Sequence, residues 1–343
     1  MLSAERQLGR AVHCTVLAKG DGSNGRAPVL VPAQKKNYRN ANFPVDEEGR
    51  TYHLGTKKGE VANRILSVGS EKRALMLSEY LEPPAPGRPL FVYESGRGFL
   101  TISGSYRGVP VSICSTLMGT PNMDFVVREN RAVVDGQMAF IRLGTCGALQ
   151  RPARLGDAIV ASPGSIFIRR DPDAFTLGGD AKPYIFSLPV PADPVLTHQL
   201  QRHLAARLGE DHVREGLNAT ADSFYSSQGR VSLFDDRNEQ LLSDLIAKHP
   251  AALSLEMETF HLLDLARCSK GTVVAAACVI ALADRTTNDF LDTASLEKLE
   301  RACGVACIAT LAACHLQNEW DMSGGSVQSV WDPLDPDPSE ASD

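Results

Sequence analysis

The chain has 343 residues and a formal net charge of −6, and 43% of its residues are hydrophobic against 22% charged. This is the balance of an ordinary globular protein, long enough for one large α/β domain or two small ones. The negative charge argues against a general nucleic-acid or membrane-surface binder. The longest apolar run, Thr272–Ala283, is far shorter than the ~20 residues that a bilayer span needs.

The two ends of the chain differ in composition from the middle. The first 44 residues carry seven Lys or Arg against two acids, whereas residues 321–343 carry six acids and no bases. We therefore expect a flexible N-terminal extension over residues 1–50, a single domain over 51–318 and a flexible acidic tail over 319–343. The basic N-terminal segment has two interpretations: a weak resemblance to an organelle transit segment, or a mobile extension. It lacks the apolar core of a secretory signal, and we expect a cytoplasmic protein.

Short apolar runs alternate with stretches of helical periodicity between these ends. The runs predict strands and the periodic stretches predict helices. We expect strands at Ile65–Val68, Val109–Cys114, Ala139–Leu143, Ala158–Ala161 and Thr272–Ala283, and helices at 123–138, 194–207, 237–248, 256–268 and 295–317. The alternation predicts an α/β domain whose mostly parallel sheet is covered by helices on both faces.

The helix expected at 194–207 has a defined start, with Asp193 as N-cap and Pro194 at the first helical position. The polar stretch before it, 163–194, is a candidate lid or insertion. The eight cysteines lie mostly in apolar stretches and form no C-x-x-C pair. They indicate buried free thiols in a reducing compartment, and we expect no zinc site.

Two basic segments follow expected strands. In I-L-S-V-G-S-E-K-R, residues 65–73, Gly69 lets backbone N–H groups approach an anion and Arg73 adds further donors. An ordinary strand-to-helix turn with a surface arginine explains the same pattern. In F-I-R-L-G-T-C-G-A-L, residues 140–149, Arg142 lies within an apolar strand, where it needs an anionic or strongly accepting partner.

Two acidic segments follow later. In S-L-E-M-E-T-F, residues 254–260, Glu256 and Glu258 flank Met257. They suit a ribose diol if the segment is extended, or a helix N-terminus that favours acids. In A-L-A-D-R-T, residues 281–286, Asp284 and Arg285 end the longest apolar run, either as site residues or as a surface ion pair of little energetic worth.

The segment A-D-S-F-Y-S-S-Q-G-R, residues 221–230, combines an aromatic pair with an amide and a cation. It is either a strand end that runs into a turn or a site for a flat, polar ring. If it is extended, Gln228 and Arg230 point the same way, beside the aromatic face of Phe224.

Taken together, these motifs resemble the uridine phosphorylases of the type I nucleoside phosphorylase family. The resemblance runs from about Tyr52 to Gln317. It includes Y-H-L-G (52–55), V-G-x-x-x-R (68–73), G-R-G-F (96–99), the Gly119–Pro121 turn, R-L-G-T-C-G (142–147), F-Y-S-S-Q-G-R (224–230), E-M-E (256–258) and D-R-T (284–286). The F-Y-x-x-Q-x-R run is the most specific, since it separates the uracil branch from the purine branch. The resemblance implies a single-domain, three-layer α/β/α fold with a central mixed, largely parallel sheet.

The resemblance also implies a role for each matching residue. Phosphate would be held by Gly69, Arg73, Arg142 and Thr145, with Arg97 reaching in from a neighbouring subunit. Ribose would be held by Glu258, Met257 and Arg142, with His53 of the neighbour at the 5′-hydroxyl. The base would be surrounded by Phe224, Gln228, Arg230, Gly147 and Glu256. The catalytic set would be Arg230, Gln228, Arg142 and Glu258, in a homo-oligomer of at least two subunits with shared active sites.

Physical chemistry agrees with this reading of the base site. Along one edge uracil presents an acceptor, a donor and an acceptor. The Gln228 amide can accept from N3–H and donate to O2, while Arg230 donates to O4. The implied reaction converts uridine and phosphate to uracil and ribose 1-phosphate in pyrimidine salvage. It requires no cofactor, and we expect no nucleic-acid or membrane partner.

Three departures from the family pattern keep alternatives open. The phosphate turn lacks the usual Asp-Pro between Gly69 and Arg73. Asp284 stands where uridine phosphorylases usually have Asn, and an Asp there is what the purine branch uses to protonate the leaving base. Gly98 replaces the Glu of a bacterial potassium site, so we expect no metal. The alternatives are a purine nucleoside phosphorylase or nucleosidase, and a non-catalytic nucleoside-binding protein on the same fold.

Overall fold

The computed structural model describes residues 37–177, 181–317 and 329–334. The strands are β1 (Tyr38–Arg39), β2 (Val45–Asp46), β3 (Arg64–Val68), β4 (Phe91–Glu94), β5 (Leu100–Tyr106), β6 (Val109–Ser115), β7 (Met138–Ala148), β8 (Ala158–Val160), β9 (Ser165–Arg170), β10 (Tyr184–Phe186), β11 (Val213–Glu215), β12 (Leu217–Ala221), β13 (Ala252–Glu256) and β14 (Val273–Asp284). The helices are α1 (Glu71–Ser78), α2 (Thr120–Val133), α3 (Pro172–Leu177), α4 (Pro194–Leu208), α5 (Leu241–Lys248), α6 (Thr259–Cys268) and α7 (Thr293–Ala313), with short 3₁₀ turns at Glu210–His212 and Ser226–Gln228.

One mixed sheet forms the centre of the molecule. Its main path runs β10-β9-β12-β13-β7-β3-β6-β5-β4, and β14 pairs with both β7 and β8. The pairs β3–β6, β3–β7 and β7–β14 are parallel, and so are β9–β12 and β12–β13. Strands β4, β5 and β10 add antiparallel edges.

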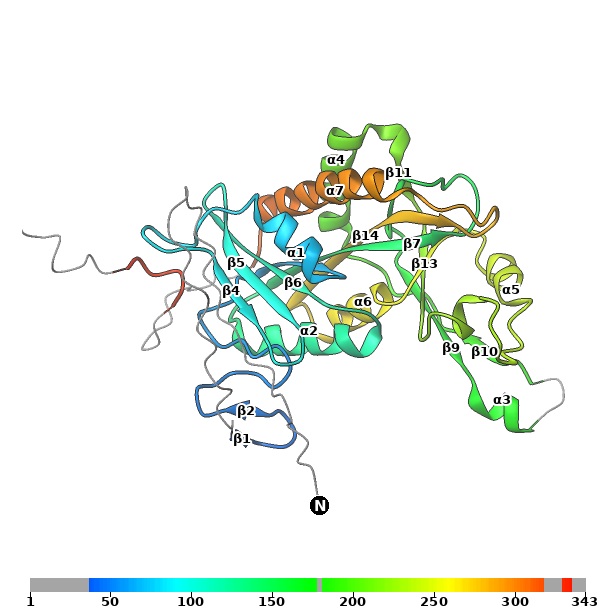
Figure 1. Ribbon diagram of the computed structural model, residues 1–343, viewed down its shortest axis with the longest axis horizontal. Helices are drawn as coiled ribbons and strands as arrows, with labels where there is room; N and C mark the ends of the chain where they lie inside the picture. Colours follow the sequence, from blue (N-terminus) through cyan, green and yellow to red (C-terminus); the bar gives the residue numbers. More distant parts are fainter. Residues whose placement is uncertain (1–36, 178–180, 318–328, 335–343) are drawn as a thin grey trace, which may run out of the picture.

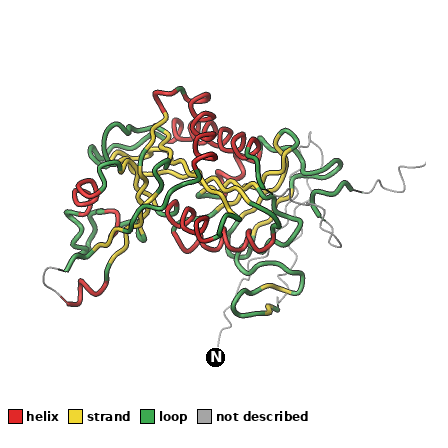
Figure 2. Tube along the Cα trace, turned by 180° about the vertical axis from the view of Figure 1, so that it is seen from behind, coloured by secondary structure: helices red, strands yellow, loops and turns green. Residues whose placement is uncertain are grey.

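Helices cover the sheet on both faces, which confirms the expected three-layer α/β/α fold. Helices α1, α4 and α7 lie on one face and α2 and α6 on the other (Figure 1). A large apolar core fills the first interface and includes Leu77, Leu200 and Ile308, while Met123, Phe140 and Leu262 belong to the core of the second. The β1–β2 hairpin lies at the border of the molecule away from β9 and β10 (Figures 1 and 2).

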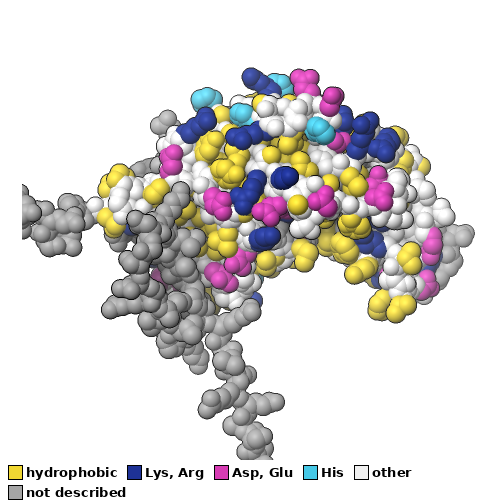
Figure 3. Space-filling view, turned by 45° about the horizontal axis from the view of Figure 1, so that its top comes forward, with side chains coloured by type: hydrophobic (Ala, Val, Ile, Leu, Met, Phe, Trp, Pro, Cys, Tyr) yellow, Lys and Arg dark blue, Asp and Glu magenta, His cyan; other side chains and the backbone are white. Residues whose placement is uncertain are grey.

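The outer face formed by α4 and α7 carries side chains of both charges, mixed with hydrophobic ones (Figure 3). No broad region of positive charge is visible on that face, in keeping with the net charge of −6. No described helix is both long enough and apolar enough to cross a membrane.

The strands expected at Ile65–Val68, Val109–Cys114, Ala158–Ala161 and Thr272–Ala283 all form, each within one residue of its expected bounds. Helix α4 begins as predicted, with the Asp193 side chain accepting from the N–H of Leu196 at 2.8 Å. The cysteines within the described residues are free thiols, and all of them are buried except Cys268, which is exposed. Cys14 lies outside the described residues.

Several boundaries differ from the expectation. The helix expected at 256–268 begins at Thr259, because Ala252–Glu256 pairs in the sheet as β13. The helix expected at 237–248 begins at Leu241, since Arg237 takes a positive φ of 47°. The stretch 163–194 is no simple lid or insertion, because it opens with β9, a strand paired within the central sheet.

Parts of both predicted end segments are structured. Residues 38–46 form the β1–β2 hairpin. At the other end, the Ser329 hydroxyl and the Val330 N–H donate to the Gly59 carbonyl at 3.1 and 3.0 Å, and Trp331 is buried. Residues 1–36, 319–328 and 335–343 lie outside the described residues, so the division into extension, domain and tail stays a prediction.

Candidate active site

The candidate site lies where β7 changes its strand neighbour. Through Ala139–Leu143, β7 pairs with β3, whereas at Gly147 and Ala148 it pairs with β13. The sheet therefore divides beyond the carboxyl end of β3, the kind of position at which open α/β sheets bind ligands. A crevice of about 270 Å³ opens there. Of the predicted site residues, its walls include Gly69, Arg73, Arg142, Thr145, Gly147, Phe224, Gln228, Arg230, Glu256, Met257 and Glu258.

Two guanidinium groups converge on Gly69 at one end of the crevice. A Cβ placed on Gly69 would lie 3.6 Å from Nη2 of Arg142 and 3.7 Å from Nη1 of Arg73. Arg73 lies in the first turn of α1, where Ser70 caps the helix by accepting from the Arg73 N–H at 3.3 Å. The missing side chain at Gly69 thus leaves room for an anion beside two cations.

Arg142 is buried in the middle of β7, as expected. Its Nη2 donates to Oε2 of Glu258 at 2.8 Å, and its Nη1 lies 3.5 Å from the Ser67 hydroxyl. Among the described residues, its buried Nε has no hydrogen-bond partner. A buried cation with a donor to spare favours an anionic ligand in the crevice.

Glu256 and Glu258 have different hydrogen-bond partners, although they are only two residues apart. The Glu256 carboxylate accepts from Asn218 at 2.8 Å and from the N–H groups of Glu258 and Thr259 at 2.9 Å each. Burial, together with the charge of Glu258, raises the pKa of Glu256. Its carboxylate is committed to the start of α6, the helix-terminus reading of the sequence, and its role at the base stays a prediction.

Glu258 lines the crevice and contacts Arg142 there. One oxygen accepts from the Gly119 N–H at 2.6 Å and the other from Arg142. Each carboxylate oxygen can accept a second hydrogen bond, so capacity remains for two hydroxyls of a sugar.

Gln228 and Arg230 converge through a turn rather than through the extended segment considered above. Ser226–Gln228 is a 3₁₀ turn and Gly229 takes a left-handed φ of 62°. Nη2 of Arg230 nonetheless lies 3.4 Å from Oε1 of Gln228, and the guanidinium stacks 4.1 Å from the centroid of the Phe224 ring. Burial lowers the pKa of Arg230, whose Nε has no hydrogen-bond partner within the described chain.

Arg285 contacts the base end of the crevice through Gln228 and Gly147. Nη2 of Arg285 donates to the Gln228 carbonyl at 2.9 Å, and a Cβ on Gly147 would lie 2.7 Å from Cγ of Arg285. Burial and the charge of Arg230 lower the pKa of Arg285 to about 10.

The Asp284 carboxylate is used within its own turn. Its Oδ1 accepts from the N–H and hydroxyl of Thr286 at 2.8 and 2.6 Å, and from the Thr287 N–H at 3.2 Å. These bonds lower the pKa of Asp284, so the group is an anion at neutral pH.

His53 and Arg97 are not brought to the crevice of their own chain. The His53 ring stacks on Phe125, with centroids 3.7 Å apart, and its Nδ1 lies 2.6 Å from Oε1 of Glu129. The Arg97 guanidinium stacks 4.3 Å from the centroid of Tyr52. Neither residue is among those that line the crevice.

Two contributing residues were missed by the sequence analysis. Asn238 donates to the carbonyls of Ser226 and Arg230 at 2.9 and 3.2 Å and so fixes the base-side turn. Glu300 pairs with Arg73. Neither had a sequence signal, because Asn238 lies in a polar loop and Glu300 in a charged stretch of α7.

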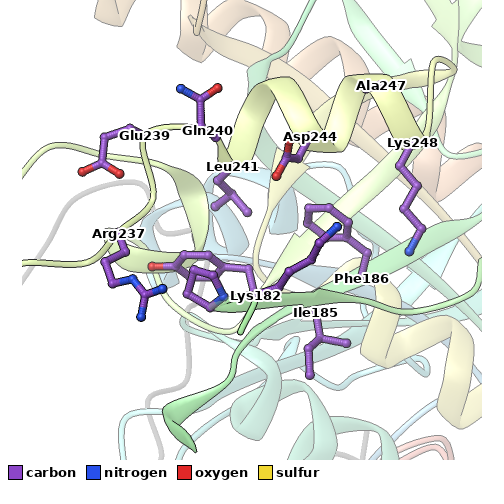
Figure 4. A pocket seen from close by; sticks show the side chains of 12 residues that line it. Lys182, Ile185, Phe186, Arg237, Glu239, Gln240, Leu241, Asp244, Ala247 and Lys248 are labelled. Atoms are coloured by element: carbon purple, nitrogen blue, oxygen red, sulfur yellow. The ribbon is translucent and has the colours of Figure 1, made fainter. Parts of the chain in front are cut away.

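A larger hollow of about 910 Å³ lies between β10 and α5 (Figure 4). Two of its three cations are already engaged: Lys248 lies over the Phe186 ring, and Arg237 donates to the carbonyl of Ala174 at 2.9 Å. It contains none of the predicted site residues. Among the residues that the structure describes, no cluster of His, Cys, Asp or Glu could hold a metal ion.

Comparisons with known proteins identify the family to which the chain is related. A model of the phosphorylase superfamily matches residues 63–314. A uridine phosphorylase of the archaeon Thermococcus kodakarensis is 30% identical over 304 residues, 87% of this chain and 98% of its own. A DeoD-type purine nucleoside phosphorylase of Oceanobacillus iheyensis is 31% identical over 62% of this chain and 80% of its own. A solved structure from work on two uridine phosphorylases of the oomycete Phytophthora capsici is 44% identical, covers 82% of this chain and all of that chain, and superposes with a TM-score of 0.76.

Proposed function

The chain belongs to the phosphorylase superfamily, and we propose that it is a uridine phosphorylase, which converts uridine and phosphate reversibly to uracil and ribose 1-phosphate. Its similarity to uridine phosphorylases covers more of the chain than its similarity to the purine enzyme. A cytoplasmic location and a role in pyrimidine salvage stay predictions from the sequence.

One observation carries this proposal: the crevice joins a base-reading pair to an anion site. Gln228 and Arg230 lie together at one end, and Arg73 and Arg142 converge at the other. Glu258 accepts from Arg142 within the same crevice. An acceptor–donor amide next to a guanidinium suits uracil, and paired guanidiniums suit phosphate.

The proposed mechanism follows from these positions. Phosphate, held by Arg73, Arg142 and the Thr145 hydroxyl, attacks the anomeric carbon of ribose from the face opposite the base. As the glycosidic bond breaks, the electron pair leaves with uracil, and its oxygens gather negative charge. Arg230 therefore binds the transition state better than the ground state. Glu258 accepts from the ribose hydroxyls and holds the sugar in line.

The positions of His53 and Arg97 support a homo-oligomer with shared sites. Both lie outside their own crevice, beside the Tyr52 ring. The mouth of the crevice also exposes apolar side chains, with Met118, Phe224 and Phe290 exposed by 74%, 46% and 66%. A second subunit over this mouth would cover these apolar side chains, and its Arg97 would add a third arginine to the phosphate site.

A purine nucleoside phosphorylase remains the alternative, favoured by Asp284 and by the DeoD-type relatives. The position of Asp284 weighs against it. Its carboxylate is held by Thr286 and Thr287 with a lowered pKa, and an ionised group is a poor proton donor to a leaving purine. A nucleosidase or a storage protein has no need of the paired arginines at Gly69.

Phosphate-dependent release of uracil from uridine tests the proposal directly. We expect release only with phosphate present, and rejection of cytidine by roughly 10⁴-fold in kcat/KM, because a mismatched base leaves buried groups unpaired. Cytidine presents the opposite pattern at N3 and C4. Release in the absence of phosphate would identify a nucleosidase. Faster turnover of inosine than of uridine would identify a purine enzyme.

A further inference from the structure

Glu300 lies behind the phosphate end of the crevice and has no role in the mechanism above. It comes from α7, and its Oε1 accepts from Nε of Arg73 at 2.9 Å and from Nη2 of the same guanidinium. Both side chains are nearly enclosed, with 10% of Arg73 and 15% of Glu300 exposed. Glu300 is not among the residues that line the crevice.

Beside this pair, one end of the Arg73 guanidinium has no hydrogen-bond partner among the residues that the structure describes. Of its five N–H donors, Nε and one on Nη2 bind Glu300, and one on Nη1 donates to the Leu143 carbonyl at 3.2 Å. The remaining donors belong to Nη1 and Nη2. Nη1 lies on the side of Gly69, 3.7 Å from the position of a Cβ there. A carboxylate thus occupies the rear edge and leaves the front edge for a bidentate anion.

Glu300 also offsets the repulsion between two cations. Burial and the charge of Arg142 lower the pKa of Arg73, and Glu300 acts in the opposite sense. Without this carboxylate, the mutual repulsion of Arg73 and Arg142 would favour movement of the flexible Arg73 side chain away from the crevice.

We propose that Glu300 is a positioning residue that holds Arg73 in its phosphate-binding orientation and thereby sets the affinity of the site for phosphate. The inference rests on the proposed phosphorylase function. It assigns a long-range partner, 227 residues away in the chain, to one half of the anion site only. Loss of the Glu300 carboxylate should therefore weaken phosphate binding and leave nucleoside binding unchanged.

The test compares Glu300→Gln with Glu297→Gln in the full-length protein. Glu297 lies one turn earlier on α7, pairs with Arg301 at 3.3 Å and is 42% exposed. We expect Glu300→Gln to raise the KM for phosphate about tenfold or more, the scale of one charge-assisted hydrogen bond. The KM for uridine and the kcat at saturating phosphate should stay within about twofold. Glu297→Gln should change none of these constants.

Two further measurements keep the outcome decisive. Glu300→Asp keeps the charge and should recover part of the phosphate affinity; it also serves if Glu300→Gln does not fold, as judged by circular dichroism. Calorimetric titration with inorganic phosphate measures affinity without turnover. Weaker phosphate binding by the variant would support the inference even if the wild type released no uracil, a result that would refute only the proposed function. If Glu300→Gln bound phosphate as tightly as the wild type, the inference about Glu300 would be wrong. Tighter binding by the variant would also overturn that inference, because it would mean that Glu300 competes with phosphate.

Discussion

Arg230 is the residue that we expect to carry the charge of the departing base. Its guanidinium stacks on Phe224 and lies beside the side-chain amide oxygen of Gln228, and its buried Nε has no partner in the described part of the chain. A cation whose hydrogen-bonding capacity is only partly used gains most when negative charge develops next to it. Its contribution should therefore appear in kcat.

The variant Arg230→Ala should lower kcat by about 10²-fold or more, the usual scale for loss of one charge-stabilising donor. The KM for phosphate should change little, because the anion is bound at the other end of the crevice. Steady-state kinetics with each substrate varied in turn measures both constants. Arg230→Lys keeps the charge but lacks the planar guanidinium, so its kcat should lie between those of the wild type and Arg230→Ala. A rise in the KM for phosphate alone would place Arg230 in the phosphate site instead.

At the scale of the element, the turn between β3 and α1 forms the proposed anion site, because one of its positions has no side chain. Gly69 has no side chain where the guanidiniums of Arg73 and Arg142 meet, and Ser70 begins α1 directly after it. The turn needs no left-handed backbone at Gly69. The residue is therefore required for space and not for backbone freedom.

Gly69→Ala should accordingly leave the fold intact and weaken phosphate binding. The added methyl group would occupy the space 3.6 and 3.7 Å from the two guanidiniums, and we expect the KM for phosphate to rise about tenfold, a loss of about 1.4 kcal/mol. Thermal unfolding checks the fold and phosphate titration checks the site. Lys72→Ala is the control, because it removes an exposed cation of the same helix turn, paired only distantly with Glu297 at 3.9 Å. Equal phosphate affinity of Gly69→Ala and the wild type would exclude an anion beside Gly69.

The sequence predicts some helices and strands well, but it does not predict contacts between distant parts of the chain. Periodicity and capping predicted α4 and the buried strand β14, because these depend on neighbouring residues. The family motifs predicted which residues share the crevice. The geometry of Gln228 and Arg230 was not predictable, since Asn238 and Arg285 hold that turn through contacts that only the fold creates. The same is true of Glu256, whose partner Asn218 lies on a neighbouring strand.

At the scale of the whole molecule, the proposed phosphate site would be incomplete within one subunit. Its crevice holds two converging arginines and an exposed apolar mouth, while Arg97 and His53 lie elsewhere on its surface. The His53 ring is held by Phe125 and Glu129, so its position is fixed without help from its own crevice. We therefore keep the prediction that both side chains serve a neighbouring subunit.

Hybrid oligomers test this sharing of residues. Arg97→Ala and Glu258→Ala should each be nearly inactive as homo-oligomers, for reasons that lie in different chains. When the two variants are refolded together, some sites combine an intact Glu258 of one chain with an intact Arg97 of the other, and activity should return. Each variant refolded alone is the control, and differently tagged chains verify that mixed oligomers form. If tagged chains copurify while activity stays at the level of the parents, Arg97 acts within its own subunit or has no role, because sharing between subunits is the only arrangement in which two defective chains rebuild one complete site.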